Sequence, residues 1–261
     1  MVTTSDTRSA ATHDGEHWLA FTVLATAILE VVAPVVTING PGSSPGAGSG
    51  PELLITPVGW AFSIWGVIYT LAIAQAVAVL VRGAHAVPRR LQVDLAVLYL
   101  GGAVWIVLAG LDSSLATAGA LLVMFVAALD AVLTTARTTF EPGWFSVLTR
   151  AAVGLYAGWV TAAFFLNIST AMVDAGLVEA DELPWQLVVL AVAAAVLLAV
   201  LVRTGGIVAY AVAGAWAMIG IAVTASQDGT TSILVAALVV VAALMATTTV
   251  WRLRAKRATS V

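Results

Sequence analysis

Eight long apolar segments dominate this sequence and limit the folds that the chain can adopt. Each has about 20 residues with few charges, the length that an α-helix needs to cross the hydrocarbon layer of a membrane. They occupy residues 18–38, 57–81, 91–111, 114–136, 145–172, 184–202, 206–225 and 231–251. The apolar runs are continuous and not alternating, which favours helices over the strands of a membrane barrel. We therefore predict an all-α integral membrane protein with eight transmembrane helices.

The composition argues against a soluble protein with the same helices. Of the 261 residues, 61% are apolar and 10% are charged, whereas soluble domains have about 25% charged residues. Cysteine is absent, and His13, His17 and His85 all lie outside the predicted helices. We therefore expect no disulfide, no metal site and no required cofactor. The net charge of −3 also indicates that nucleic acid is not a partner. We expect the chain to be surrounded by the lipid bilayer.

The basic residues predict the orientation of the chain in the membrane. If the helices alternate in direction, every Lys and Arg lies on the side that holds the N-terminus: Arg8, Arg82, Arg89, Arg90, Arg137, Arg150, Arg203, Arg252, Arg254, Lys256 and Arg257. Basic residues accumulate on the cytoplasmic side of membrane proteins. We therefore expect an integral protein of the cell (plasma) membrane with both termini in the cytoplasm.

An acidic loop divides the predicted helices into a group of five and a group of three. The expected organisation is a cytoplasmic N-terminal tail (1–17), a five-helix bundle (18–172), an acidic outer loop (173–183), three additional helices (184–252) and a basic cytoplasmic tail (253–261).

Ionisable residues inside membrane helices are costly and usually have a purpose. Asp130 lies seven residues before the inner end of the fourth helix, about 10 Å deep at 1.5 Å per residue, and Arg150 lies at a similar depth in the fifth. We predict a structural ion pair between Asp130 and Arg150; the alternative is a proton or ion relay. Glu30 has no cation at its depth in the first helix. It either forms a hydrogen bond to a neighbouring helix or anchors a ligand in a pocket.

Aromatic and amide side chains concentrate in the outer half of the first five predicted helices. Such residues around a few polar groups are typical of a small-molecule pocket, although aromatic residues also fill membrane bundles simply by packing. The candidate ligand-binding residues are Glu30, Trp60, Trp65, Tyr69, Trp105, Tyr156, Trp159 and Asn167. Gly154 and Gly158 form a GxxxG motif, which permits close helix contact within the bundle or in a homodimer.

The fifth predicted helix resembles that of the TspO/translocator-protein family, the tryptophan-rich sensory proteins. The family pattern is close to Y-x-x-W-V-x-x-A-x-x-L-N, and all six fixed positions match: Tyr156, Trp159, Val160, Ala163, Leu166 and Asn167. The second helix opens with Thr56, Pro57, Gly59, Trp60, Phe62, Trp65 and Tyr69, similar to the family's T-P-x-G-W-x-F…W-x-x-x-Y. The resemblance covers residues 18–172. Where the family commonly has Asn one turn before the tryptophan of the third helix, this chain has Gly102.

This resemblance implies a five-helix bundle with a ligand pocket beneath the first extramembrane loop, lined by Trp60, Trp65, Tyr69, Trp105, Trp159 and Asn167. The leading hypothesis is a membrane sensory or binding protein that holds a porphyrin-like, haem-like or other hydrophobic small molecule, without catalytic residues. One alternative is a transporter of small solutes or tetrapyrroles that uses all eight helices. Another is an enzyme that oxidises tetrapyrroles through its tryptophans.

Overall fold

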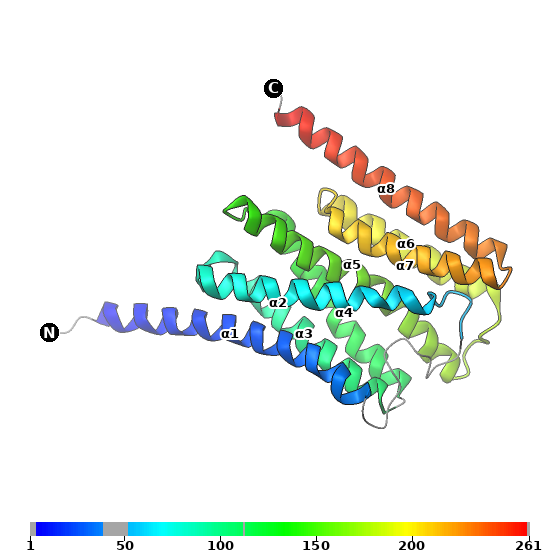
Figure 1. Ribbon diagram of the computed structural model, residues 1–261, viewed down its shortest axis with the longest axis horizontal. Helices are drawn as coiled ribbons and strands as arrows, with labels where there is room; N and C mark the ends of the chain where they lie inside the picture. Colours follow the sequence, from blue (N-terminus) through cyan, green and yellow to red (C-terminus); the bar gives the residue numbers. More distant parts are fainter. Residues whose placement is uncertain (1–3, 39–51, 112, 260–261) are drawn as a thin grey trace.

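The computed structural model describes residues 4–38, 52–111 and 113–259, and in this part of the chain it contains helices and no strands (Figure 1). The long helices are α1 (Thr4–Ile38), α2 (Ile64–Arg82), α3 (Arg89–Ala109), α4 (Ser114–Arg137), α5 (Gly143–Asp174), α6 (Leu183–Arg203), α7 (Val208–Gln227) and α8 (Thr231–Thr259). Two short 3₁₀ helices, η1 (Gly59–Ser63) and η2 (Ala84–Ala86), flank α2. All eight long helices are long and apolar enough to cross a membrane, which confirms the predicted fold class.

The ends of the first and last helices differ from the sequence prediction. Helix α1 begins at Thr4 instead of residue 18, and α8 continues to Thr259 instead of residue 251. The apolar pattern predicts where a helix crosses the hydrocarbon layer, and a helix that has already formed can extend into water at little cost. The connection between α3 and α4 is short, as predicted, although α3 ends at Ala109 instead of residue 111; Asp112 in this connection lies outside the described residues.

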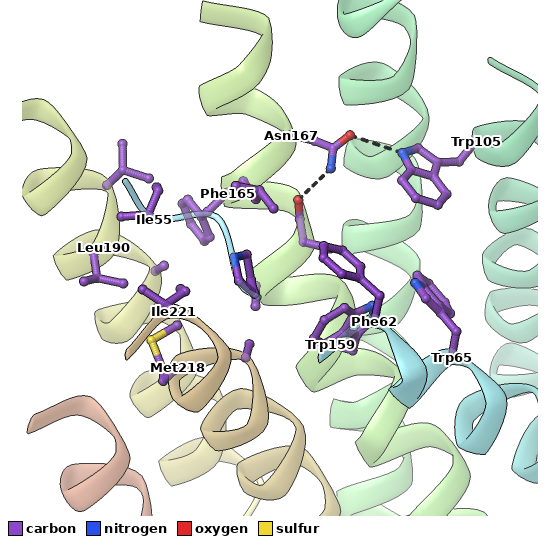
Figure 2. A pocket seen from close by; sticks show the side chains of 17 residues that line it. Ile55, Phe62, Trp65, Trp105, Trp159, Phe165, Asn167, Leu190, Met218 and Ile221 are labelled. Atoms are coloured by element: carbon purple, nitrogen blue, oxygen red, sulfur yellow. Dashed lines mark hydrogen bonds between the residues drawn. The ribbon is translucent and has the colours of Figure 1, made fainter. Parts of the chain in front are cut away.

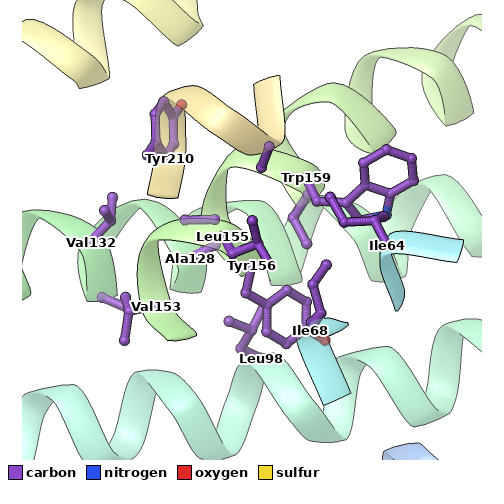
Figure 3. Packing of buried hydrophobic residues seen from close by; sticks show 14 of the residues in the cluster. Ile64, Ile68, Leu98, Ala128, Val132, Val153, Leu155, Tyr156, Trp159 and Tyr210 are labelled. Carbon is purple, nitrogen blue, oxygen red and sulfur yellow. The ribbon is translucent and has the colours of Figure 1, made fainter. Parts of the chain in front are cut away.

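Helix α5 lies at the centre of the bundle. Every residue from Ala152 to Thr161 is buried, so α5 is covered on all sides at this level. Its neighbours are α2, α4, α6 and α7. Figure 3 shows Tyr156, Leu155 and Val153 of α5 among side chains from α2, α3, α4 and α7. A helix that is apolar around its whole circumference is typical of such a central position.

Two glycines allow α7 to approach α5 closely. A Cβ atom at Gly158 would lie 2.5 Å from the Tyr210 carbonyl oxygen and 2.8 Å from the Ala213 Cβ, and one at Gly154 would lie 2.8 Å from Ile207. The GxxxG motif therefore forms a contact within the chain. As a result, α6 and α7 pack directly on α5, and α8 packs against α6 and α7.

Large apolar side chains cover the outside of the bundle. Phe21, Val36, Leu238 and Met245 are among the exposed ones. An apolar surface this extensive is unfavourable in water but matches the hydrocarbon of a membrane. The beginning of α1 and the end of α8 lie on the same side of the bundle (Figure 1), as an even number of crossings requires.

The predicted ion pair between Asp130 and Arg150 is wrong. Asp130 on α4 instead accepts hydrogen bonds from two guanidinium nitrogens of Arg90 on α3. Arg150 donates to the backbone carbonyl of Thr138, 3.3 Å away. Depth along a helix indicates the level of a residue but not the side on which it lies, and Asp130 faces α3. Because the Arg90 side chain is 70% exposed, this pair is expected to stabilise the fold only modestly.

Candidate ligand cavity

A partly open cavity of about 50 Å³ lies between α2, α3, α5, α6 and α7 (Figure 2). Its lining residues lie toward the helix ends opposite those that carry the basic residues. Four of the eight predicted ligand-binding residues line it: Trp65, Trp105, Trp159 and Asn167. The other lining residues are apolar: Ile55, Pro57, Phe62, Ala162, Ala163, Phe165, Leu166, Val189, Leu190, Ala193, Ala217, Met218 and Ile221.

Trp65 is the centre of the aromatic wall of this cavity, which α2, α3 and α5 form. Its ring stacks on Trp105 with centroids 6.1 Å apart and meets Trp159 edge to face at 6.2 Å. Phe62 also packs edge to face against Trp159, with ring centroids 5.8 Å apart. Offset-stacked and edge-to-face arrangements are the favourable geometries for aromatic pairs. The wall is therefore a packed set of rings with defined orientations.

Asn167 provides the amide group of the cavity. Its Oδ1 accepts a hydrogen bond from Trp105 Nε1 at 3.2 Å, and its Nδ2 donates to the Ala163 carbonyl at 3.2 Å (Figure 2). The amide thus fixes the orientation of the Trp105 ring across the α3–α5 interface. By contrast, Trp159 Nε1 is buried and has no hydrogen-bond partner among the described residues.

The opposite wall of the cavity is aliphatic and comes from α6 and α7. Leu190 and Ala193 of α6 and Met218 and Ile221 of α7 line it; Figure 2 shows Leu190, Met218 and Ile221 on this side. These side chains offer shape but no hydrogen-bonding groups. The helices that follow the acidic loop therefore complete the cavity.

The segment that precedes α2 closes the cavity and is attached to α6 and α7. The Ile55 amide donates to Oε1 of the buried Gln186 at 3.3 Å, and the Val58 amide donates to the Gly220 carbonyl at 3.1 Å. A Cβ at Gly220 would lie 3.0 Å from the Pro57 Cβ, so a glycine permits this close approach. Trp216 Nε1 adds a hydrogen bond to the Ala61 carbonyl at 2.7 Å. These contacts hold Ile55 and Pro57 over the cavity.

The other four candidate residues lie beside the cavity and do not line it. Tyr69 stacks on Trp65 at 5.4 Å, and Tyr156 meets the same ring edge to face at 5.8 Å. Both tyrosines therefore support the Trp65 ring from behind. Trp60 is 46% exposed and packs edge to face against Trp216, with centroids 5.0 Å apart.

Glu30 is fully buried behind the aromatic wall and accepts a hydrogen bond from the Tyr156 hydroxyl. The sequence left two roles for this carboxyl, a hydrogen bond to a neighbouring helix or a ligand anchor. In the structure it forms the hydrogen bond, to Tyr156 of α5. A Cβ at Gly102 would overlap Glu30 Oε1 and would lie 2.9 Å from the Tyr156 hydroxyl. Glu30 therefore occupies the space that a larger side chain at position 102 would need. Its Oε2 has no partner among the described side chains and backbone groups.

A second hollow, of about 370 Å³, lies between α1 and α3 on the outside of the bundle. Its lining consists of aliphatic side chains such as Leu29, Val32, Val104 and Val107, several of which are exposed. Binding sites usually combine apolar surface with a few orienting polar groups, and this groove has only the apolar surface. We therefore take the smaller aromatic cavity as the candidate site.

The sequence profile of the TSPO-like protein family matches residues 16–251 of this chain. The chain belongs to the TSPO-like protein family. This match confirms the resemblance found in the second and fifth helices. The matched range also includes α6, α7 and the part of α8 up to residue 251 of this TSPO-like protein, which that resemblance did not cover. The chain matches no curated protein and no solved structure at a significant level.

Sequence reasoning missed the aliphatic wall of this TSPO-like protein. Val189, Leu190, Ala193, Ala217, Met218 and Ile221 line the cavity, but valine, leucine and alanine occur throughout all eight helices. No local pattern distinguishes the few that face a cavity from those that face lipid. The small residues Gly154 and Gly158 were the one available signal, because they indicated that another helix approaches α5 closely.

Proposed function

We propose that this TSPO-like protein binds a flat hydrophobic molecule, of porphyrin-like size or smaller, between its aromatic and aliphatic walls. The supporting observation is that Trp65, Trp105, Trp159 and Asn167, which the sequence predicts as ligand-binding residues, line one cavity. Aromatic faces suit stacking on a planar ligand, and the apolar surroundings suit a molecule that reaches the site from the membrane.

Occupation of the cavity requires side chains to move. Its volume of about 50 Å³ is well below the roughly 150 Å³ that holds a benzene molecule. The rings of Phe62 and Trp65 and the segment with Ile55 and Pro57 form one boundary, and small residues such as Ala162 and Ala193 form another. We infer that a ligand displaces part of this lining and that the described form is the closed one.

The proposed setting is the cell membrane, with both chain ends in the cytoplasm and the cavity in the outer half of the bilayer. The distribution of Lys and Arg supports this orientation, because all of them lie at the end opposite the cavity. A single cysteine at the half-buried Ser114 or at the exposed Arg203 in this cysteine-free chain should react with a membrane-impermeant reagent from the outside and the inside of cells, respectively. The reverse pattern would contradict the orientation.

Ligand titration of a matched pair of tryptophan variants tests the binding function. Trp65→Ala removes the central ring of the aromatic wall, whereas Trp18→Ala removes an exposed ring on α1 that is far from the cavity in sequence and 72% exposed. We expect Trp65→Ala to weaken the binding of protoporphyrin IX dimethyl ester at least tenfold, because about 2 kcal/mol of aromatic contact is lost. Equal affinities of both variants and the wild type, measured by fluorescence quenching in nanodiscs, would place binding elsewhere.

A further inference from the structure

Glu30 of α1 is a buried carboxyl that lacks part of its hydrogen bonding. Its side chain is fully buried, and among the described residues no other acidic side chain is. The Tyr156 hydroxyl donates a hydrogen bond to Oε1, whereas Oε2 has no partner in the described part of the chain. An ionisable residue inside a membrane helix is costly and usually has a purpose. The missing partner of Oε2 therefore needs an explanation.

Three tyrosine hydroxyls are the titratable groups that face this carboxyl: those of Tyr69 on α2, Tyr99 on α3 and Tyr156 on α5. His85 of η2, which also packs against α1, lies at the end of the bundle that carries the Lys and Arg residues, the basic end. The acidic residues of α3 and α4 interact with Arg90 instead. An ionised carboxylate would therefore be buried without a counter-charge, which is unfavourable. A proton on Oε2 removes this charge and requires no cavity.

The other buried polar atoms without a partner lie mostly between Glu30 and the basic end. In the part of the chain that the structure describes, one of them is Trp159 Nε1, beside the aromatic wall. The rest belong to residues nearer the basic ends of their helices: Gln75, Gln92, Asp94, Thr135 and Thr149. Water usually supplies the hydrogen bonds that such buried groups lack. Groups that can bind water are therefore concentrated on the side of Glu30 that faces the basic end.

Helices α2 and α5 lie side by side from the level of Tyr156 to the basic end. At one level the ring of Trp65 meets that of Tyr156, with centroids 5.8 Å apart. At the other, the guanidinium carbon of Arg82 lies 5.3 Å from the centroid of the Phe145 ring. These two contacts define a stretch of the α2–α5 interface that connects the surroundings of Glu30 with the basic end.

Gln75 and Thr149 lie within this stretch, one on each helix. Both side chains are fully buried, and neither the Gln75 amide nor the Thr149 hydroxyl has a hydrogen-bond partner among the described residues. Thr149 comes seven residues before Tyr156, close to two helical turns, so it lies on the same face of α5 about 10 Å nearer the basic end. The two polar groups thus lie between the basic end and the residue that donates to Glu30.

From these observations we propose that Glu30 is a proton-binding site inside the membrane and that protons reach it from the basic end, past Thr149 and Gln75. Oε2 of the ionised form takes a proton from a hydronium ion, which leaves one water molecule and a neutral carboxylic acid. Tyr156 keeps its own proton and its hydrogen bond to Oε1. The packed rings of the aromatic wall close the opposite side. This proton site is independent of the proposed ligand binding.

Infrared spectroscopy of the full chain in nanodiscs at neutral pH tests the proton on Glu30. We expect a C=O band of a protonated carboxyl that shifts when glutamate is isotope-labelled, because the other described glutamates are exposed. Glu30→Gln keeps the size of the side chain and an acceptor for Tyr156, and it should remove the band. A wild type without this band overturns the proposal, and this result is decisive even if the variant fails to fold. A band that persists in folded Glu30→Gln also overturns it.

The path is tested by the rate at which this band shifts after transfer from light to heavy water. Thr149→Val keeps the shape of the side chain and removes its hydroxyl, and Gln75→Leu removes the amide. Each should slow the exchange about fivefold, the size of one net hydrogen bond to water. Thr170→Val is the matched control, because Thr170 lies toward the other end of α5 and donates to the Leu166 carbonyl; it should exchange at the wild-type rate. Wild-type rates in both Thr149→Val and Gln75→Leu overturn the path.

Discussion

The two walls of the cavity differ in chemistry and in how they can be recognised. The wall from α2, α3 and α5 consists of tryptophan and phenylalanine rings with one amide, whereas the wall from α6 and α7 consists of Leu190, Ala193, Met218 and Ile221 and their aliphatic neighbours. Aromatic rings can stack on a planar ligand and donate hydrogen bonds to it. Aliphatic side chains can only determine how much space remains. The comparison suggests that the first wall recognises the ligand and the second limits its size.

Removal of a ring from the recognising wall should have the largest effect. Trp159→Ala deletes the ring that contacts both Phe62 and Trp65 and the unpartnered indole donor. We expect about 30-fold weaker binding of protoporphyrin IX dimethyl ester, which corresponds to roughly 2 kcal/mol. Isothermal titration of the purified protein measures this change, and thermal unfolding shows whether the variant is folded. An affinity within twofold of the wild type would mean that this wall does not recognise the ligand.

Added volume on the size-limiting wall should have a smaller effect that depends on ligand size. Ala193→Leu places about three extra carbon atoms in the cavity from α6, and we expect about fivefold weaker binding of the porphyrin ester because overpacking costs about 1 kcal/mol or more. The smaller 9-fluorenone should lose less.

Val192→Leu is the matched control for this variant, because it adds bulk to the adjacent position, which is 47% exposed on the outside of α6. Its affinities should equal those of the wild type. If Ala193→Leu also binds both ligands normally, α6 does not limit the ligand, and the division between the two walls is refuted.

The smallest effect is expected at a tryptophan that the family resemblance assigns to the pocket but that the structure places outside it. Trp60 packs on Trp216 and is not part of the lining. Trp60→Phe should therefore change the affinity for the porphyrin ester less than twofold while leaving the fold intact. A loss comparable to that of Trp159→Ala would extend the recognising wall to the beginning of η1.

Much of the fold and four of the 17 residues that line the candidate site could be predicted from the sequence. The eight helices follow from apolar segment length, because the thickness of the hydrocarbon layer imposes a minimum number of residues on each. Trp65, Trp105, Trp159 and Asn167 could be placed at one level because depth in a membrane helix follows directly from residue number.

What the sequence could not provide is the side of the helix on which a residue lies. Asp130 and Arg150 have matching depths, yet Asp130 pairs with Arg90 because it faces α3. Glu30 has the depth of a pocket residue, yet it faces Gly102 and Tyr156 and lies behind the Trp65 ring. Rotation about the helix axis depends on which helices become neighbours, and that is a property of the whole bundle.

Photolabelling with benzophenone, an uncharged aromatic ketone that reacts with nearby C–H bonds, tests most directly that both walls enclose one ligand. The protein in nanodiscs is irradiated with and without excess 9-fluorenone, and the modified residues are identified by mass spectrometry. Our account predicts that the label suppressed by fluorenone lies on α5, α6 and α7 around Leu166, Leu190 and Met218. Suppressible label confined to the groove between α1 and α3, around Leu29 and Val104, would contradict it.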